Sequence, residues 1–365
     1  MGKQTENRKA EHINICLDKK AQARKVTPGF EDVQFIHQAL PEVDKNKIEM
    51  STTVFGHKFS APLIIGAMTG GTTEAKQINA AIAEAVENLH LGMGVGSQRA
   101  AIENPKLAET FSVARKKAPT AFLIANIGGI QLVHGCGMKE VKQAVEMIDA
   151  DAVAVHLNAL HETVQPEGQT RFNGVLDKIC GIVGEIDKPV IVKETGAGIS
   201  AETAKKLEKA GAKAIDVGGA GGTSFAAVEY FRSKASSLQH FLGDVFWDWG
   251  IPTVASLVET VQTVKIPVIS SGGVRSGMDV AKSLALNACL GSVCQPVLEI
   301  ATKGAKAMEQ WILLLIEEIK NVMFLVGAER IEDLKEIPVV VSGKTAEWLK
   351  TRGFSVESYS RRGEC

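Results

Sequence analysis

The glycine-rich stretch at residues 270–277, which reads SSGGVRSG, contains the residue types that bind a phosphate group. Glycines let backbone N–H groups approach an anion closely, and N–H groups at the start of a helix carry partial positive charge. Arg275 adds a charged donor. We expect this stretch to hold a phosphate, with further donors from Gly221-Gly222-Thr223. The alternative interpretation is a glycine-rich turn that binds nothing.

Lys193 ends an apolar run that we expect to form a buried strand. Its charge should therefore be partly buried, inside the mouth of the barrel that such strands would form, and needs an anionic partner. Glu194 follows directly and, by strand alternation, should point the other way. Residues with hydroxyl, amide or exposed N–H groups follow other apolar runs; they are Met68-Thr69-Gly70-Gly71, Ser97 and Asn126. Such groups can hydrogen-bond to the carbonyl and ring-nitrogen edge of a flavin. The alternative for Lys193 is a structural ion pair.

A third group of polar residues follows the apolar run near residue 155. Strand alternation sends His156 and Asn158 to the same side. Glu162 is a candidate Mg²⁺ ligand, because hard cations prefer carboxylate and phosphate oxygens. A transition-metal site of His156, His161 and Glu162 is an alternative, but no second histidine follows at the spacing of a zinc protease. A solvated glutamate is the remaining interpretation.

Basic residues lie near the amino terminus and after the second apolar run. Arg8-Lys9 and His12 form a basic arm, and Arg99 follows Ser97-Gln98. Such residues are often simply solvated. Close to a rim that already binds phosphate, they can instead fold over a second, substrate phosphate as a lid.

The elements that position these residues alternate between short apolar runs and helical periodicity, which predicts an α/β fold with a single (β/α)8 TIM barrel. We expect an N-terminal extension over 1–57 and a catalytic barrel over 58–365. Ser200 should cap a helix that Gly211 ends, and Ser276 with Asp279 fits a capping box. The strands are expected at 63–67, 91–96, 121–126, 151–158, 189–194, 214–218, 267–271 and 289–294. Helices are expected at 74–88, 138–148, 279–286 and 305–324.

Composition limits the class of protein. The chain of 365 residues is 45% hydrophobic, enough for a large core, and its net charge of −1 gives no reason to expect nucleic acid or an anionic membrane as a partner. The 6 cysteines form no CxxC pair, which favours free thiols in a reducing cytosol. Residues 1–20 are polar and no apolar stretch is long enough to span a bilayer. We expect a soluble cytoplasmic protein.

At these residues the chain resembles a known family, the FMN-dependent type 2 isopentenyl-diphosphate Δ-isomerases, over nearly its whole length. The motifs that carry the resemblance are Arg8-Lys9-xx-His12, Gly66-Ala67-Met68-Thr69-Gly70-Gly71, Gly94-Val95-Gly96-Ser97-Gln98-Arg99, His156-Leu157-Asn158, Gln165-Pro166-Glu167-Gly168, Val192-Lys193-Glu194, Gly221-Gly222-Thr223 and Ser271-Gly272-Gly273-Val274-Arg275.

The resemblance implies a homo-oligomer, a tetramer or octamer, that uses reduced FMN, Mg²⁺ and NADPH to interconvert isopentenyl and dimethylallyl diphosphate, with the flavin acting in proton transfer. It implies Glu162 as the metal ligand and His161, Lys193 and His156 as catalytic residues. The FMN-binding residues would be Ala67, Met68, Thr69, Ser97, Asn126, Lys193, Thr223, Gly273, Arg275, Cys294 and Gln295. The substrate-binding residues would be Arg8, Lys9, His12, Gln98, Arg99, Asn158 and His161.

The chain departs from the family at a few positions. His161 stands where the family usually has glutamine directly before the metal-binding glutamate; Thr195, Asn287 and Cys294-Gln295 are further departures. Because histidine can itself transfer protons, the change at His161 bears on the proton-transfer arrangement. The alternatives are an FMN-dependent oxidoreductase of the 2-hydroxy-acid oxidase kind, an aldolase-like barrel with a Lys193 Schiff base, and a flavin-binding paralogue with altered activity.

Overall fold

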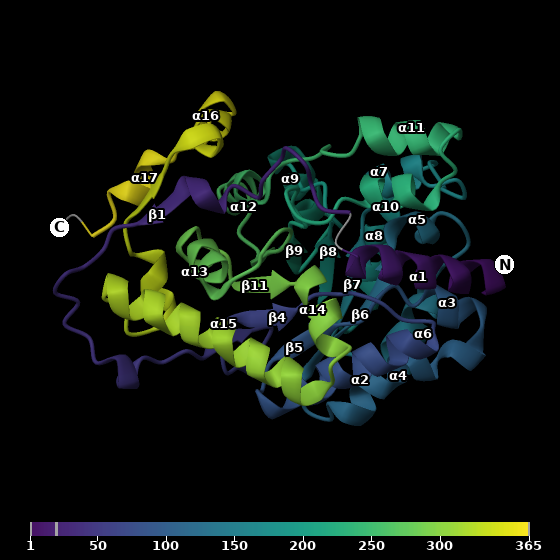
Figure 1. The fold of residues 1–365 in the computed structure, drawn as a ribbon, viewed down its shortest axis with the longest axis horizontal. Helices are drawn as coiled ribbons and strands as arrows, with labels where there is room; N and C mark the ends of the chain where they lie inside the picture. Colours follow the sequence, from purple (N-terminus) through teal and green to yellow (C-terminus); the bar gives the residue numbers. More distant parts are fainter. Residues whose placement is uncertain (1, 19–20, 364–365) are drawn as a thin grey trace.

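The computed structural model describes residues 2–18 and 21–363 and has a closed barrel of parallel strands at its centre (Figure 1). Each of the eight predicted runs overlaps one barrel strand, and β6 extends two residues beyond its predicted run, so the predicted (β/α)8 barrel is confirmed. The strands are β4 (Leu63–Ile65), β5 (Gly92–Gly94), β6 (Phe122–Gly128), β7 (Ala152–His156), β8 (Val190–Lys193), β9 (Ala214–Asp216), β10 (Val268–Ser270) and β11 (Leu290–Val293).

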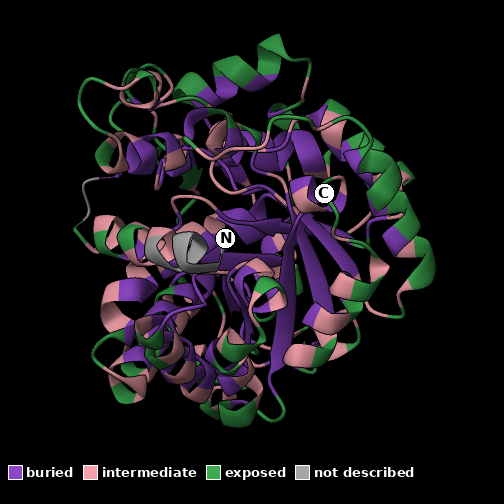
Figure 2. Ribbon diagram, turned by 90° about the vertical axis from the view of Figure 1, so that its right-hand side faces the viewer, coloured by how far each residue is buried: buried purple, intermediate pink, exposed green. Residues whose placement is uncertain are grey.

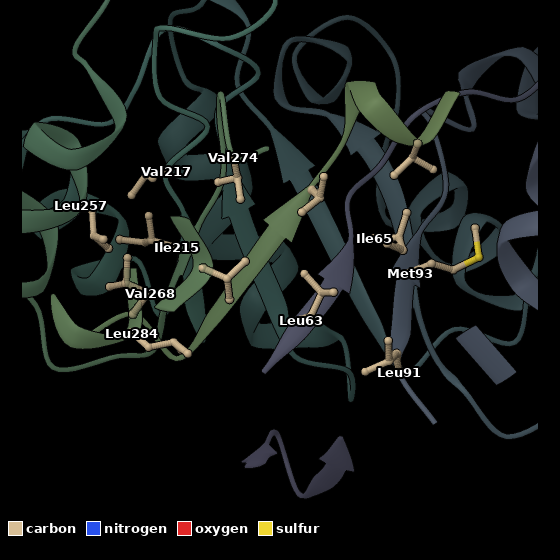
Figure 3. Close-up of a cluster of buried hydrophobic side chains, with 14 of the residues drawn as sticks. Leu63, Ile65, Leu91, Met93, Ile215, Val217, Leu257, Val268, Val274 and Leu284 are labelled. Atoms are coloured by element: carbon tan, nitrogen blue, oxygen red, sulfur yellow. The ribbon is translucent and has the colours of Figure 1, made fainter. Parts of the chain in front are cut away.

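Alternation along each strand divides the core into two parts. Ile64, Ile124 and Ile191 belong to the cluster that fills the barrel. Their neighbours Leu63 and Ile65 belong instead to the larger cluster between strands and helices, part of which Figure 3 shows. The strands are accordingly buried on both faces, as Figure 2 shows and as expected for parallel strands covered by helices.

The predicted helix signals are confirmed. Ser200 accepts a hydrogen bond from the N–H of Thr203, Gly211 has a positive φ of 92°, and Ser276 and Asp279 form a capping box. The main helices of the outer layer are α2 (Thr73–Asn88), α4 (Glu109–Lys117), α6 (Met138–Met147), α8 (Val175–Glu185), α9 (Ala201–Lys209), α10 (Phe225–Arg232), α12 (Thr253–Val261), α13 (Gly277–Ala285) and α15 (Ala305–Val326).

The chain before the barrel contributes three separate pieces. The helix α1 (Gly2–Leu17) lies beside the barrel helices α3 and α10 (Figure 1). The strand β1 (Val33–Phe35) pairs antiparallel with β12 (Val339–Val341). The hairpin of β2 (Thr52–Val54) and β3 (His57–Phe59) adds Val54 and Phe59 to the cluster inside the barrel. The predicted domain boundary between 57 and 58 falls within β3.

Shorter elements complete the described chain, and none of its helices is long and apolar enough to cross a membrane. The five cysteines in the described residues are free, as expected, and Cys365 lies outside these residues. The short helices are α3 (Arg99–Glu103), α5 (Gly129–Leu132), α7 (Ala159–Val164), α11 (Leu238–Val245), α14 (Gln295–Ala301), α16 (Gly343–Thr351) and α17 (Glu357–Ser360). The 3-10 turns are η1 (Phe30–Asp32), η2 (Lys45–Lys47), η3 (Pro105–Leu107) and η4 (Ile331–Lys335).

Candidate active site

Inward-facing polar side chains at the carboxyl ends of the strands surround a cavity of about 270 Å³. The strand register places Asn126, His156 and Lys193 at successive positions of this ring, one step beyond the apolar residues that fill the barrel. Most residues predicted to bind a ligand line the cavity; they are Arg8, Lys9, His12, Ala67, Met68, Thr69, Ser97, Arg99, Asn126, His156, Asn158, His161, Glu162, Lys193, Thr223, Gly273, Arg275, Cys294 and Gln295.

Lys193 is the member of this ring on β8, between His156 of β7 and Asp216 of β9. Its Nζ donates to the Glu194 carbonyl at 2.6 Å and lies 4.0 Å from Asp216 Oδ2. The Glu194 carboxylate turns the other way, as alternation predicts, and accepts the N–H groups of residues 195–197. Burial raises the pKa of Glu194 to about 7. Sequence reasoning missed Asp216, although it ends β9 in direct register with Lys193.

His156 and Asn126 form a buried hydrogen-bonded pair with Nδ1 and Oδ1 2.8 Å apart. Burial, with the nearby charge of Lys193, lowers the pKa of His156 to about 3, so the ring is neutral at neutral pH. Asn126 Nδ2 donates to the Val95 carbonyl, which leaves Oδ1 as the acceptor. His156 therefore carries its proton on Nδ1, and Nε2 is an acceptor on a residue that lines the cavity.

Gln98, predicted to bind substrate, does not line the cavity. Its side chain is fully buried; Nε2 donates to the Ala144 carbonyl at 2.8 Å, and Oε1 accepts the backbone N–H of Asn126 at 2.9 Å. Helix α3 begins at the next residue, and the turn before it directs Gln98 into the helix layer. The structure therefore does not place the Gln98 side chain among the residues of the cavity; its Oε1 instead positions Asn126.

The predicted phosphate stretch packs directly against residues 221–223. A Cβ added to Gly222 would lie 2.5 Å from the backbone nitrogen of Gly273, so the two loops need glycine to approach each other. The N–H groups of Thr223 and Gly273 donate to no other described residue, although both residues line the cavity. Arg275 is held by Gln22, whose Oε1 accepts from Nη2 at 2.7 Å. These free N–H groups and the guanidinium can bind an anion.

Helix α1 brings the basic arm to the cavity. Lys9 Nζ donates to the Ser97 carbonyl at 2.7 Å and lies 5.0 Å from the centre of the Phe111 ring. Burial and the adjacent Arg8 lower the pKa of Lys9 to about 7. Arg8 Nη1 lies 3.4 Å from Gln165 Oε1. The arm thus places two cationic side chains at the cavity wall.

Glu162 is a buried carboxylate held only by amide groups. It accepts hydrogen bonds from Asn158 Nδ2 at 3.0 Å, from Gln165 Nε2 at 2.7 Å and from the backbone N–H of Gln169 at 2.7 Å. Within the described residues it forms no ion pair, and the buried Asn158 Oδ1 has no hydrogen-bond partner. A buried negative charge without a cation, next to a free amide oxygen, fits a hard metal ion. Sequence reasoning did not assign the supporting roles of Gln165 and Gln169.

His161 faces away from Glu162 and toward helix α10. Its Nε2 lies 2.8 Å from Glu229 Oε1, and its ring stacks on Phe225 with ring centres 4.5 Å apart. The fully buried Glu229 also contacts His12 and Arg232. Although burial acts to raise it, hydrogen bonds from both histidines hold the pKa of Glu229 well below its usual range. The sequence carried no signal for Glu229, because it lies in mid-helix.

The alternative metal grouping of His156, His161 and Glu162 is not the one the fold assembles. In the part of the chain that the structure describes, the histidine and carboxylate atoms that converge belong to His12, His161 and Glu229.

Comparison with known proteins gives consistent matches. The family model described as FMN-dependent dehydrogenase matches residues 2–126 and 151–340. A Methanosarcina barkeri protein named isopentenyl-diphosphate delta-isomerase is 48% identical, over 99% of this chain and 98% of its own length. Proteins with that name from Methanothermobacter thermautotrophicus (48% identical, 98% of this chain, 99% of the relative) and Pyrococcus furiosus (48%, 96% and 90%) are similar too.

Solved structures with the same fold are flavin enzymes of low sequence similarity. A variant of mandelate oxidase with an FMN adduct aligns with a TM-score of 0.62 at 18% identity, covering 89% of this chain and 95% of its own. A variant of flavocytochrome b2 aligns with a TM-score of 0.64 at 18% identity, covering 94% and 85%. At this identity the likeness extends to the fold alone.

Proposed function

The chain belongs to the isopentenyl-diphosphate delta-isomerase family, and from that premise we propose that it interconverts isopentenyl and dimethylallyl diphosphate with FMN and Mg²⁺, and with NADPH as the flavin reductant. The observation that carries the proposal is the convergence of three features on one cavity: free loop N–H groups with Arg275, the inward-facing Lys193, and the uncompensated carboxylate of Glu162.

The cavity residues fit FMN. The N–H groups of Thr223 and Gly273 with Arg275 would hold its phosphate, because they form an anion site beside the start of α13. Lys193 and Asn126 would face the ring. The buried hydroxyl of Ser292, which also lines the cavity, has no hydrogen-bond partner and is available to a ligand.

A second group of residues that line the cavity fits a diphosphate and a metal ion. Arg8, Lys9 and Arg99 supply positive charge there, and Glu162 with Asn158 supplies oxygen ligands. Neutralising the diphosphate and fixing its position would place the attached alkene over the cavity floor. Such positioning removes entropy from the reaction before the chemical step.

Moving the double bond requires one carbon to gain a proton and another to lose one. An unactivated alkene is a poor base, so the transition state carries positive charge. Bound reduced FMN would supply an electron-rich ring that stabilises this charge and takes part in proton transfer. His156 keeps a neutral acceptor nitrogen at the cavity, and Lys193 supplies a fixed positive charge beside Asp216. His161 is a further proton-transfer candidate, since its imidazole lines the cavity.

We extend the proposal to the setting of the enzyme. The substrate is a small diphosphate, the protein works in the cytoplasm without nucleic acid or membrane partners, and it assembles as a homo-oligomer, a tetramer or octamer. The near-neutral net charge of −1 supports the absence of polyanionic partners.

The test is one incubation of the purified protein with FMN, Mg²⁺, NADPH and isopentenyl diphosphate, followed by product analysis. Formation of dimethylallyl diphosphate is expected. A yellow protein that leaves the substrate unchanged would contradict the proposal. It would favour an isomerase paralogue with altered activity, a second candidate that the engagement of His161 by Glu229 and Phe225 supports. His161→Gln restores the residue usual in the family and, assayed in parallel, measures the effect of this departure.

A further inference from the structure

Three side chains from separate elements meet beside the cavity: His12 of α1, His161 of α7 and Glu229 of α10. The Nε2 atoms of His12 and His161 lie 3.0 and 2.8 Å from the same oxygen, Glu229 Oε1. We infer that these three residues form a binding site for a divalent transition metal such as Zn²⁺, separate from the magnesium site proposed at Glu162. This inference goes beyond the proposed function and does not depend on it.

The geometry agrees with coordination. For zinc bonds of about 2.0–2.1 Å, neighbouring ligand atoms lie about 2.8–3.0 Å apart in octahedral sites and about 3.3–3.4 Å apart in tetrahedral sites. The two measured nitrogen–oxygen separations are close to these edge lengths, and all three ligand atoms lie within 4.8 Å of one another. An ion can therefore enter with small side-chain shifts. In the metal-free site both rings donate Nε2–H to Glu229. Metal binding would therefore move the proton of each neutral ring to Nδ1 and free the Nε2 lone pair for coordination.

Neighbouring groups hold the ligands in place, as outer-shell partners do in known metal sites. Arg232 Nη1 donates to Glu229 Oε2, which orients the carboxylate and leaves Oε1 toward the histidines. The ring of Phe225 stacks on His161 and restricts its rotation. Arg232 also pairs with Glu11 and with Glu167, which it shares with Arg8. Two arginines therefore face three carboxylates, with Glu229 counted, and the resulting net charge of −1 does not repel a cation.

The ligand set selects the class of metal. Mg²⁺ and Ca²⁺ prefer sites made entirely of oxygen, whereas imidazole favours zinc, copper, nickel and iron. Two histidines and one carboxylate leave at least one coordination position for water or a substrate oxygen. Because His12 and His161 both line the cavity, that position is next to the cavity. A bound ion would also tie α1 to the barrel.

The test is calorimetric titration of the full-length holoenzyme with Zn²⁺ in excess Mg²⁺. We expect one saturable site whose affinity falls at least about tenfold in His161→Gln and in His12→Gln, since even outer-shell partners contribute about 10–100-fold. Two matched controls should keep the affinity: His134→Gln, an exposed histidine, and Glu162→Gln. No saturable binding, or equal affinity in wild type and His161→Gln, would overturn the inference.

Two further measurements keep the result interpretable. Titration with Co²⁺ distinguishes the ligands by absorption, because binding to a free cysteine would add an intense thiolate band and would also refute the site. Hydrogen exchange of residues 8–17 should slow when Zn²⁺ is added to wild type and stay unchanged in His161→Gln. Neither readout involves isomerisation, so an inactive enzyme that binds Zn²⁺ at this site would contradict only the proposed function.

Discussion

The Nζ atom of Lys193 lies 4.0 Å from Asp216 Oδ2, across two neighbouring strands at the mouth of the barrel. The Ser271 hydroxyl, directly after β10, donates a hydrogen bond to the other oxygen of Asp216 and so fixes the position of the carboxylate. The lysine charge is therefore fixed at the cavity by the barrel and does not depend on a mobile loop.

Lys193→Met should reduce isomerase activity by at least about a hundredfold, the usual cost of losing one preorganised electrostatic group, and should weaken FMN binding. Turnover assays and flavin fluorescence titration measure the two effects. Lys178→Met, at an exposed lysine of α8, is the matched control and should behave as wild type. Full activity in Lys193→Met would refute the role given to this residue.

Lys9 should make substrate affinity depend on pH. Its pKa is lowered to about 7, so the fraction of charged Lys9 falls as pH rises above 7 in the substrate-free enzyme. KM for isopentenyl diphosphate should consequently rise between pH 7 and 9, by up to about tenfold per pH unit. Steady-state assays across this range test the expectation. Lys9→Gln should have a high KM that changes little with pH; a parallel rise in both proteins would assign the effect to another group.

Gly96→Ala should disturb the cavity through the backbone. An added Cβ would lie 2.6 Å from the carbonyl carbon and oxygen of Thr69, which lines the cavity, so the loop after β4 must shift. We expect FMN affinity to fall at least about tenfold, since a small misplacement of positioning groups is costly. Gly181→Ala is the control: it is exposed in α8 with open space around it and should be neutral or slightly stabilising.

Glu162→Gln should raise the Mg²⁺ concentration needed for half-maximal activity at least about tenfold, because it removes the charge that would hold the ion. The new amide oxygen can still accept from Gln165 Nε2 and from the Gln169 N–H, and Asn158 can turn its unpartnered Oδ1 toward the new amide nitrogen, so the fold should be retained. Activity measured against Mg²⁺ concentration tests this, and FMN titration should give an unchanged affinity. An unaltered Mg²⁺ requirement would place the magnesium ion elsewhere.

Arg352 stabilises the packing of α16 against α12. It donates to both oxygens of the fully buried Glu259, at 3.1 and 3.2 Å. Arg352→Met would leave this carboxylate without its cation, and we expect the free energy of unfolding to fall by about 2 kcal/mol. This loss is smaller than that for breaking a fully buried ion pair, because the arginine is partly exposed. Arg330→Met removes an exposed pair with Asp333 and should cost less than about 0.5 kcal/mol. Urea denaturation of both variants provides the comparison.

The barrel was predictable because its signals are local. Each strand is a short apolar run that ends in glycine or polar residues, and strand alternation predicted that His156 and Asn158 share one side and that Glu194 points away from Lys193. The same reasoning could have found Asp216. The direction of the Gln98 side chain was not predictable, because it depends on the turn into α3, which the apolar pattern does not encode.

The remaining features depend on contacts between distant segments. Helix α1 is mostly polar, and its place is set by contacts such as those of Lys9 with Ser97 and of His12 with Glu229. Glu229 lies within α10 among residues with ordinary helical periodicity. No local pattern indicates that such a residue will face two histidines, one of them from the amino-terminal arm.

The ladder between β1 and β12 joins segments that are roughly 300 residues apart in the chain, so closing it carries a high entropic cost that earlier folding must reduce. During synthesis on the ribosome, β1 cannot pair until β12 has been translated. The barrel can begin to assemble first, so the pairing of β1 with β12 is a late event in biogenesis.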